Sequence, residues 1–252
     1  MQVVAVTQAR IGSTRFPGKI LQETKGVSLL EMHLRRILQA KKIDKLIVAT
    51  TFEDDIHKVK NIAEALGVKV FQGSMDDVLD RFYQATRQDQ PEYVVRLTSD
   101  CPLIDPALID KVIQFTIDNK LDYASNTLEE KYPDGQDVEV FTFKALQEAW
   151  QSATIPSDRE HVTPYIRKNS SFFGKAPFRS ANFNEGADLG RIRMTVDEPA
   201  DFEMIKILVK ELGMNATMEE YVEYLLTHPA VMEKNNNISR NEGYFKSLRN
   251  DN

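Results

Sequence analysis

The chain has 252 residues, enough for one large α/β domain or two small ones, and its 42% hydrophobic and 28% charged residues are typical of a globular protein. The formal net charge of −6 argues against a general nucleic-acid-binding protein. A single cysteine, Cys101, excludes an internal disulfide framework and a zinc site built from several cysteines. We see no signal peptide and no apolar run near the ~20 residues that span a bilayer, so we expect a cytoplasmic protein with no membrane partner.

Predicted strands and helices alternate through the first half of the chain. The first helix is expected to begin at Ser28, because Ser28 and Glu31 have the spacing of a capping box. Apolar runs predict strands at residues 3–6, 45–51, 68–71, 93–98 and 122–125, and helical periodicity predicts further helices at 54–66, 76–87 and 106–119. This alternation predicts an α/β fold with three layers, in which helices cover both faces of a mostly parallel sheet.

The second half is less regular. Strands are expected at residues 137–143 and 191–196, and helices at 143–152, 157–168, 199–212 and 217–227. Capping-box spacings mark the start of two of these helices, with Ser157 and Glu160 in one and Thr217 and Glu220 in the other. No Pro/Gly/Ser-rich linker divides the chain, which favours one domain over residues 1–232 with an inserted lobe at about 125–185. The polar residues 233–252 are expected to form a tail or an arm.

The stretch Gln8–Leu21, which reads QARIGSTRFPGKIL, follows the first strand and combines cations with glycines and hydroxyls. Glycine lets backbone N–H groups approach a ligand closely, so the stretch suits a polyanion such as a triphosphate. It is not a Walker A loop, because five residues separate Gly12 from Gly18 and Ile20 follows Lys19. The alternative is a solvated basic turn.

Asp100 and Asp197 each follow directly on a predicted strand. The carboxyl ends of parallel strands meet at one edge of a sheet, so these two side chains could lie together and share a Mg²⁺ ion. The alternative is that each aspartate only caps the helix that follows, since Pro102 and Pro199 come soon after.

The segment GSTRFPGKIL closely resembles the signature of the cytidylyltransferases that make CMP-activated sugars. These are the 3-deoxy-manno-octulosonate and acylneuraminate cytidylyltransferases and the related spore-coat polysaccharide branch, which also matches PDGQDVEVF, REHVTPYIR and SRNEGYFKSL. The resemblance implies a nucleotide-diphosphosugar transferase (Rossmann-like) fold. It also implies transfer of CMP from CTP to a small anionic sugar acid, release of pyrophosphate, Mg²⁺ as cofactor, and a homodimer, since such enzymes are often dimers.

The same resemblance assigns roles to individual residues. The triphosphate would be held by Arg10, Ser13, Arg15 and Lys19. The rest of the nucleotide site would comprise Gln8, Ala9, Gly12, Thr98 and, for the pyrimidine, Arg81. Asp100 and Asp197 would hold the metal, and the catalytic candidates are Arg10, Lys19 and Asp100. Ser99 and Cys101 depart from the family's Gly-Asp-x-Pro-Leu segment beside that aspartate.

The acceptor candidates are Gln136, Asp137, Glu139 and His161. The alternative for the first three is a surface hairpin, and the alternative for His161 is a structural role.

Two other functions fit parts of the pattern. A glycosyltransferase that uses a nucleotide-sugar donor would need an Asp-x-Asp motif after a central strand, and Ser99 stands directly before Asp100 here. A nucleotide-binding module without turnover would not need both the basic loop and the two aspartates.

Overall fold

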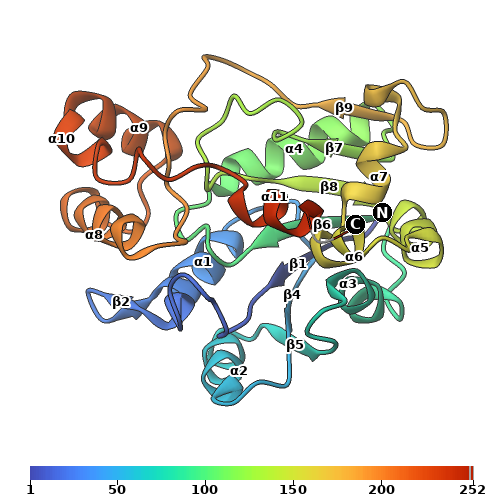
Figure 1. Ribbon diagram of the computed structural model, residues 1–252, viewed down its shortest axis with the longest axis horizontal. Helices are drawn as coiled ribbons and strands as arrows, with labels where there is room; N and C mark the ends of the chain where they lie inside the picture. Colours follow the sequence, from blue (N-terminus) through green and yellow to red (C-terminus); the bar gives the residue numbers. More distant parts are fainter. Residues whose placement is uncertain (250, 252) are drawn as a thin grey trace.

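A seven-stranded sheet with the order β5-β4-β1-β6-β8-β7-β9 runs through the centre of the computed structural model, which describes residues 1–249 and 251 (Figure 1). Its strands are β1 (Val3–Gln8), β4 (Lys45–Thr50), β5 (Lys69–Gln72), β6 (Tyr93–Thr98), β7 (Tyr123–Ser125), β8 (Glu139–Thr142) and β9 (Ser180–Asn182). Neighbours from β5 to β6 pair in parallel, as do β7 and β9, whereas β8 is antiparallel to both β6 and β7. A hairpin of β2 (Glu23–Thr24) and β3 (Val27–Ser28) stands apart from this sheet.

Helices lie on both faces of the sheet. They are α1 (Leu29–Ile37), α2 (Ile56–Ala65), α3 (Val78–Thr86), α4 (Pro106–Asp118), α5 (Phe143–Ser152), α6 (Pro156–His161), α7 (Pro164–Lys168), α8 (Pro199–Leu212), α9 (Met218–Thr227), α10 (Pro229–Met232) and α11 (Glu242–Arg249), with 3-10 turns η1 (Lys19–Leu21) and η2 (Ser171–Phe173). No helix within residues 1–249 is long and apolar enough to cross a membrane.

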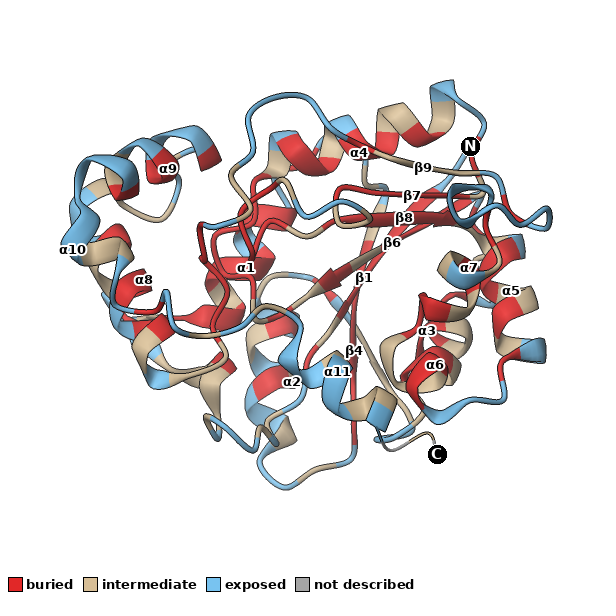
Figure 2. Ribbon diagram, turned by 45° about the horizontal axis from the view of Figure 1, so that its top comes forward, coloured by how far each residue is buried: buried red, intermediate tan, exposed pale blue. Residues whose placement is uncertain are grey.

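The alternation of side chains along β1 explains the three layers. Val3 and Ala5 join a core with α1, α2, α4, α8 and α9, whereas Val4 and Val6 join a second core with α3, α5 and α7. Figure 2 shows the central strands buried and the outer helix surfaces exposed. A strand that is apolar on both faces belongs in the middle of a parallel sheet, so the predicted fold class is confirmed.

Two of the three helix starts predicted from capping spacings are correct. Ser28 Oγ accepts a hydrogen bond from Glu31 N at 3.2 Å at the start of α1. Thr217 and Glu220 form both halves of a capping box at the start of α9.

The single helix predicted at residues 157–168 is wrong. The chain forms α6 and α7 instead, with Val162 at φ +72° between them. Pro164 has no N–H to donate to the carbonyl of Glu160, and its ring would clash with the preceding turn. The predicted cap fails as well, because Ser157 Oγ is buried and has no hydrogen-bond partner among the described residues.

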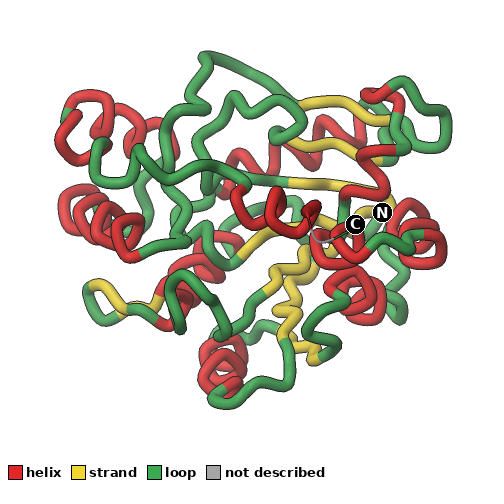
Figure 3. Tube along the Cα trace, in the orientation of Figure 1, coloured by secondary structure: helices red, strands yellow, loops and turns green. Residues whose placement is uncertain are grey.

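The late strand predicted at 191–196 is also wrong. This stretch is drawn as the loop that leads into α8 in Figure 3, and it makes one isolated bridge, between Asp134 and Arg193. Its backbone bonds to two distant segments, since Met194 N donates to Asp134 O at 2.6 Å and Val196 N donates to Asp100 O at 2.8 Å. The stretch therefore brings Asp197 to the end of β6 without joining the sheet.

Residues 125–185, which are expected to form an inserted lobe, supply both strands and helices. They contribute β8 and β9 to the sheet, and α5 and α7 pack against one of its faces. The proposed division into residues 1–232 and a tail stays a prediction, and positions 250 and 252 of that tail lie outside the described residues.

Gly135 should be essential to the packing of the turn that faces residues 191–196. Its φ is +100°, and an added Cβ would lie 2.5 Å from Thr195 N and 2.6 Å from Met194 C. We expect Gly135→Ala to destabilise the fold by about 3 kcal/mol through strain and overlap with backbone. Gly174 is a matched control, since its φ is +74° but nothing lies within 4 Å of an added Cβ.

The Gly174→Ala change should therefore cost only about 1 kcal/mol. Urea unfolding of both variants measures the difference. Equal losses would show that the contact with residues 194 and 195 is unimportant.

Candidate active site

Three side chains that are far apart in the sequence meet at the ends of β1 and β6. Lys19 Nζ lies 3.1 Å from Asp100 Oδ2 and 2.7 Å from Asp197 Oδ1. Arg15 NH2 lies 3.1 Å from the same Asp197 oxygen. The two carboxylates therefore converge on one point, and that point is occupied by a cation.

The first loop folds so that Lys19 reaches this point. Gly18 has φ +66° and donates from its N–H to Ile11 O at 3.1 Å, which closes the loop before η1. Ser13 Oγ accepts from Phe16 N at 3.4 Å and supports the same turn. Lys19 is the first residue of η1, and its side chain is only 13% exposed.

A buried histidine fixes the loop that carries Asp100. His33 on α1 lies between Thr7 Oγ1, at 2.9 Å, and the carbonyl oxygen of Cys101, at 2.8 Å. Burial lowers the pKa of His33 to about 4, so the ring is neutral at pH 7. A neutral ring that donates from Nδ1 to Cys101 must accept from Thr7 at Nε2, which ties β1 to the residue next to Asp100.

The ion pairs between Lys19 and the two aspartates determine the charge states of Lys19 and Asp100. Burial acts to raise the pKa of Asp100, but the charge of Lys19 and hydrogen bonds from Thr98 and Lys19 hold it below its ordinary value. Burial acts to lower the pKa of Lys19, but Asp100 and Asp197 together hold it above its ordinary value. The lysine and Asp100 are therefore both charged across the physiological range.

Arg193 holds the far side of Asp197. Its Nε lies 2.8 Å from Asp201 Oδ1, its NH2 lies 3.2 Å from Asp197 Oδ2, and its NH1 pairs with Asp134. The side chains of Asp134, Asp197 and Asp201 thus surround this buried guanidinium. It orients Asp197, and the sequence did not predict this role because the stretch was expected to be a strand and Asp134 comes from a distant segment.

Backbone N–H groups of the first loop already hold an anion. Glu53 accepts from Gly12 N at 2.8 Å and from Ile11 N at 3.3 Å, and it also accepts from Thr51 Oγ1. Nothing in the sequence around Glu53 pointed to this contact. The loop is therefore able to bind a negatively charged group through its main chain.

Arg81 on α3 lies close to the same loop. Its side chain is buried, its NH1 donates to Ser74 O at 2.6 Å, and its Nε has no hydrogen-bond partner among the described residues. Burial and the nearby charge of Arg10 lower the pKa of Arg81 to about 10. An under-used buried cation of this kind is suited to a ligand group that replaces the missing partner.

The remaining nucleotide candidates line the same sheet edge. Gln8 Oε1 accepts from Arg96 Nε at 3.3 Å, and Ala9 N donates to Ala49 O at 3.0 Å. Thr98 Oγ1 lies 3.3 Å from Cys101 Sγ.

Two of the residues that were predicted to contact the sugar acceptor already have hydrogen-bond partners inside the fold. Gln136 has no exposed surface, and its amide bonds to Asp105 N and Leu103 O at 2.8 Å each, so it supports the loop after β6. The buried carboxylate of Glu139 receives hydrogen bonds from Arg96, from Tyr123 OH at 2.6 Å and from Thr163 Oγ1 at 2.6 Å.

Their hydrogen bonds give Gln136 and Glu139 a supporting role in the fold, and their contact with an acceptor stays a prediction.

The other two acceptor candidates face the C-terminal segment. Asp137 Oδ1 accepts from Arg240 NH2 at 2.7 Å. His161 lies 3.0 Å from Ser247 Oγ, and its ring meets the edge of Tyr244. The tail thus folds back over the site of its own chain, whereas the sequence left open what it covers. Figure 1 shows it running from α10 to α11 near the centre of the view.

A pocket of about 270 Å³ opens beside α11. It is lined by Pro164, Arg167, Lys168, Phe173, Lys175 and Tyr244. The cations make it suited to an acidic group, and the sequence had singled out only the segment that carries Arg167.

The donor set fits a divalent cation that keeps most of its water. Within the part of the chain that the structure describes, no group of three or more His, Cys, Asp or Glu side chains gathers as a complete metal cage. Mg²⁺ commonly takes one or two carboxylates and completes its shell with phosphate and water. Asp100 and Asp197, which already converge on the ammonium of Lys19, meet that requirement.

Comparison with known proteins identifies the family. The family model described as "Cytidylyltransferase" matches residues 4–239. The chain belongs to the cytidylyltransferase family. The family expected from the first loop is therefore confirmed.

Individual relatives match along nearly the whole chain. A cytidylyltransferase from Leptospira borgpetersenii has a similar solved structure, with a TM-score of 0.86, 30% identity, and coverage of 92% of this chain and 97% of that one. The spore coat polysaccharide biosynthesis protein SpsF of Bacillus subtilis is 34% identical, over 84% of this chain and 88% of its own length. The uncharacterized protein MJ1063 of Methanocaldococcus jannaschii is 36% identical, over 94% of this chain and 96% of its own length.

In this cytidylyltransferase, His33 should make stability depend on pH. The folded ring resists protonation down to about pH 4, whereas the unfolded ring binds a proton near its ordinary pKa of 6.5. Stability should therefore be lost as the pH falls through this window, by up to about 3 kcal/mol from His33, and His161, whose pKa is also lowered to about 4, adds to the slope.

In urea unfolding between about pH 4 and pH 6.5, the free energy of unfolding should depend less on pH in His33→Asn than in the wild type. The exposed control His57→Asn should keep the wild-type dependence. An unchanged slope in His33→Asn would contradict the assignment.

Proposed function

We propose that this cytidylyltransferase transfers CMP from CTP to a hydroxyl of a sugar acid and releases pyrophosphate. The observation that carries the proposal is the convergence of Lys19, Asp100 and Asp197 on one point at the edge of the sheet. Family membership supports cytidylyl transfer in general terms. The resemblance of the first loop to the octulosonate and neuraminate enzymes supports a sugar acid as the acceptor.

The cationic loop would hold the leaving group. Arg10, Arg15 and Lys19, with Ser13 and the N–H of Gly12, would bind the β- and γ-phosphates and stabilise the negative charge that develops on pyrophosphate. Positioning and charge neutralisation account for most of the catalysis of phosphoryl transfer, so this role does not need a covalent intermediate.

Asp100 and Asp197 would hold Mg²⁺, which when bound neutralises the α-phosphate and acidifies the attacking hydroxyl. Arg193 and the Thr7–His33–Cys101 chain would keep the two carboxylates aimed at the same point. Lys19 would give up its contacts with them and move to phosphate, because the ion supplies the positive charge that the lysine supplies here.

The nucleoside and the sugar-acid acceptor would contact two separate sets of residues. Arg81, together with Gln8, Ala9 and Thr98 at the ends of β1 and β6, would contact the nucleoside. Asp137 and His161 would face the acceptor. Cytoplasmic location, a homodimer and the single domain over residues 1–232 stay predictions.

The variants Lys19→Ala and Asp100→Ala should each lower kcat by about a hundredfold or more, because each removes charge stabilisation that acts in the transition state. The measurement is pyrophosphate release with CTP, Mg²⁺ and a panel of sugar acids that includes 3-deoxy-manno-octulosonate and N-acetylneuraminate. The control Lys41→Ala, an exposed lysine, should keep wild-type rates. Circular dichroism checks folding, and wild-type activity in either test variant would refute the proposal.

Glu242 on α11 should compete with the triphosphate. Its carboxylate lies 3.1 Å from Arg15 NH1, which we assign to phosphate binding. Removing this charge in Glu242→Gln should lower KM for CTP by about twofold to fivefold, since a partly exposed ion pair is weak. Glu64→Gln, an exposed change of the same charge on α2, should leave KM unchanged. A KM for CTP that stays equal or rises in Glu242→Gln would contradict the assignment.

A further inference from the structure

The C-terminal segment, residues 233–249, places one buried cation inside the candidate site. Arg240 NH2 lies 2.7 Å from Asp137 Oδ1, and NH1 donates to Tyr132 O at 3.0 Å. Its Nε lies 3.8 Å from Asp134 Oδ1, and the side chain is only 11% exposed. A guanidinium this deeply buried must be balanced by the charges around it.

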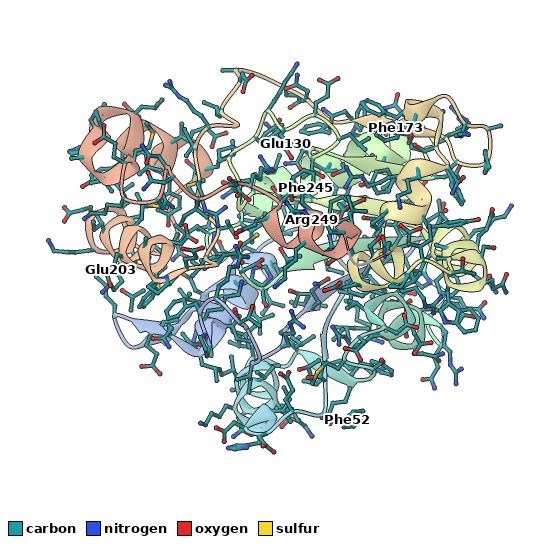
Figure 4. All side chains as sticks on the ribbon, in the orientation of Figure 1. Phe52, Glu130, Phe173, Glu203, Phe245 and Arg249 are labelled. Carbon is teal, nitrogen blue, oxygen red and sulfur yellow. The ribbon has the colours of Figure 1, made fainter. Side chains whose placement is uncertain are left out.

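Contacts on both sides fix the segment. Before Arg240, the buried Asn235 donates from Nδ2 to Asp201 Oδ1 at 2.9 Å. After it, Asn241 Nδ2 donates to Glu130 Oε1 at 2.6 Å, and Ser247 Oγ donates to Glu160 Oε2 at 2.7 Å. Figure 4 labels Glu130, which binds Asn241, and Phe245 on α11. Arg240 is therefore held in place by the fold.

The surroundings of Arg240 are acidic. Burial and the charge of Asp137 raise the pKa of Asp134 to about 7, and Asp100 adds to this effect. Burial also raises the pKa of Asp137, with Glu139 and Asp100 acting in the same direction. The cations that oppose these effects are Arg240 and Arg193 at Asp134, and Arg240 and Arg96 at Asp137.

Asp137 keeps one oxygen available. Arg240 binds Oδ1, whereas Oδ2 accepts no hydrogen bond from any residue that the structure describes, and the side chain is 30% exposed. A carboxylate that is fixed at one oxygen and open at the other is suited to accept a hydrogen bond from a sugar hydroxyl.

We propose that Arg240 is a positioning residue that determines acceptor specificity, because it holds Asp137 for an acceptor hydroxyl and offsets the acidic cluster that would repel an anionic sugar. The inference rests on the proposed function, which makes the acceptor a sugar acid. It assigns Arg240 to the acceptor site, whereas Glu242 of the same segment faces Arg15 of the first loop.

Steady-state kinetics that separate KM for the acceptor from kcat and from CTP affinity test the role of Arg240. With the sugar acid of the panel that the wild type uses, Arg240→Ala should raise KM for the acceptor about tenfold, with little change in kcat or in CTP·Mg²⁺ affinity by calorimetry. Arg240→Lys should recover part of the loss, and Lys246→Ala, an exposed cation of the same segment, should have no effect. Equal losses of acceptor and CTP affinity would overturn the proposal.

Stability against pH tests the charge balance without any acceptor. The folded Asp134 carboxyl binds a proton that the unfolded chain releases, so stability falls as the pH rises toward 7. Losing Arg240 should raise this pKa further, so Arg240→Ala should lower Tm more at about pH 8.5 than at about pH 5.5.

Equal losses of Tm at both pH values would mean that Arg240 only packs and would overturn the proposal. If the wild type uses no sugar acid, the proposed function fails, and the pH comparison still decides whether Arg240 balances the acidic cluster.

Discussion

A lysine ammonium held between two aspartates is the interaction on which the rest of the site depends. Lys19 comes from the first loop, Asp100 from the end of β6 and Asp197 from the stretch before α8. Lys19 and Asp100 would each be costly to bury alone with a charge, and together they keep one another ionised. The same arrangement suits an exchange of partners, in which phosphate takes the lysine and a divalent ion takes the carboxylates.

The surrounding structure mainly maintains this arrangement. His33 ties β1 to the Asp100 loop, and Arg193 binds the far oxygen of Asp197. Gln136, buried behind the loop after β6, bonds to its backbone at Leu103 and Asp105. These groups decide where the proposed reacting residues point, because a catalytic geometry must be held by its supporting hydrogen bonds.

The C-terminal segment adds a second set of charged side chains to this site. Arg240 enters the acidic cluster, and Glu242 pairs with Arg15 on the basic loop. The segment thus places the guanidinium of Arg240 among acidic side chains, and it places the carboxylate of Glu242 beside the guanidinium of Arg15. Its charges are thus complementary to those of the proposed acceptor residue Asp137 and of the proposed phosphate-binding residue Arg15.

The sequence by itself determined the layers, most element positions and the family, because periodicity, caps and a contiguous motif are local properties. It also indicated Asp100 and Asp197, although the strand expected before Asp197 does not form. Sequence reasoning could not assign Glu53, Arg193 or Arg240, and it could not show that Gln136 and Glu139 are held by hydrogen bonds inside the fold. Only the tertiary structure decided these roles, since each depends on which distant segments supply a side chain's hydrogen-bond partners and how far it is removed from water.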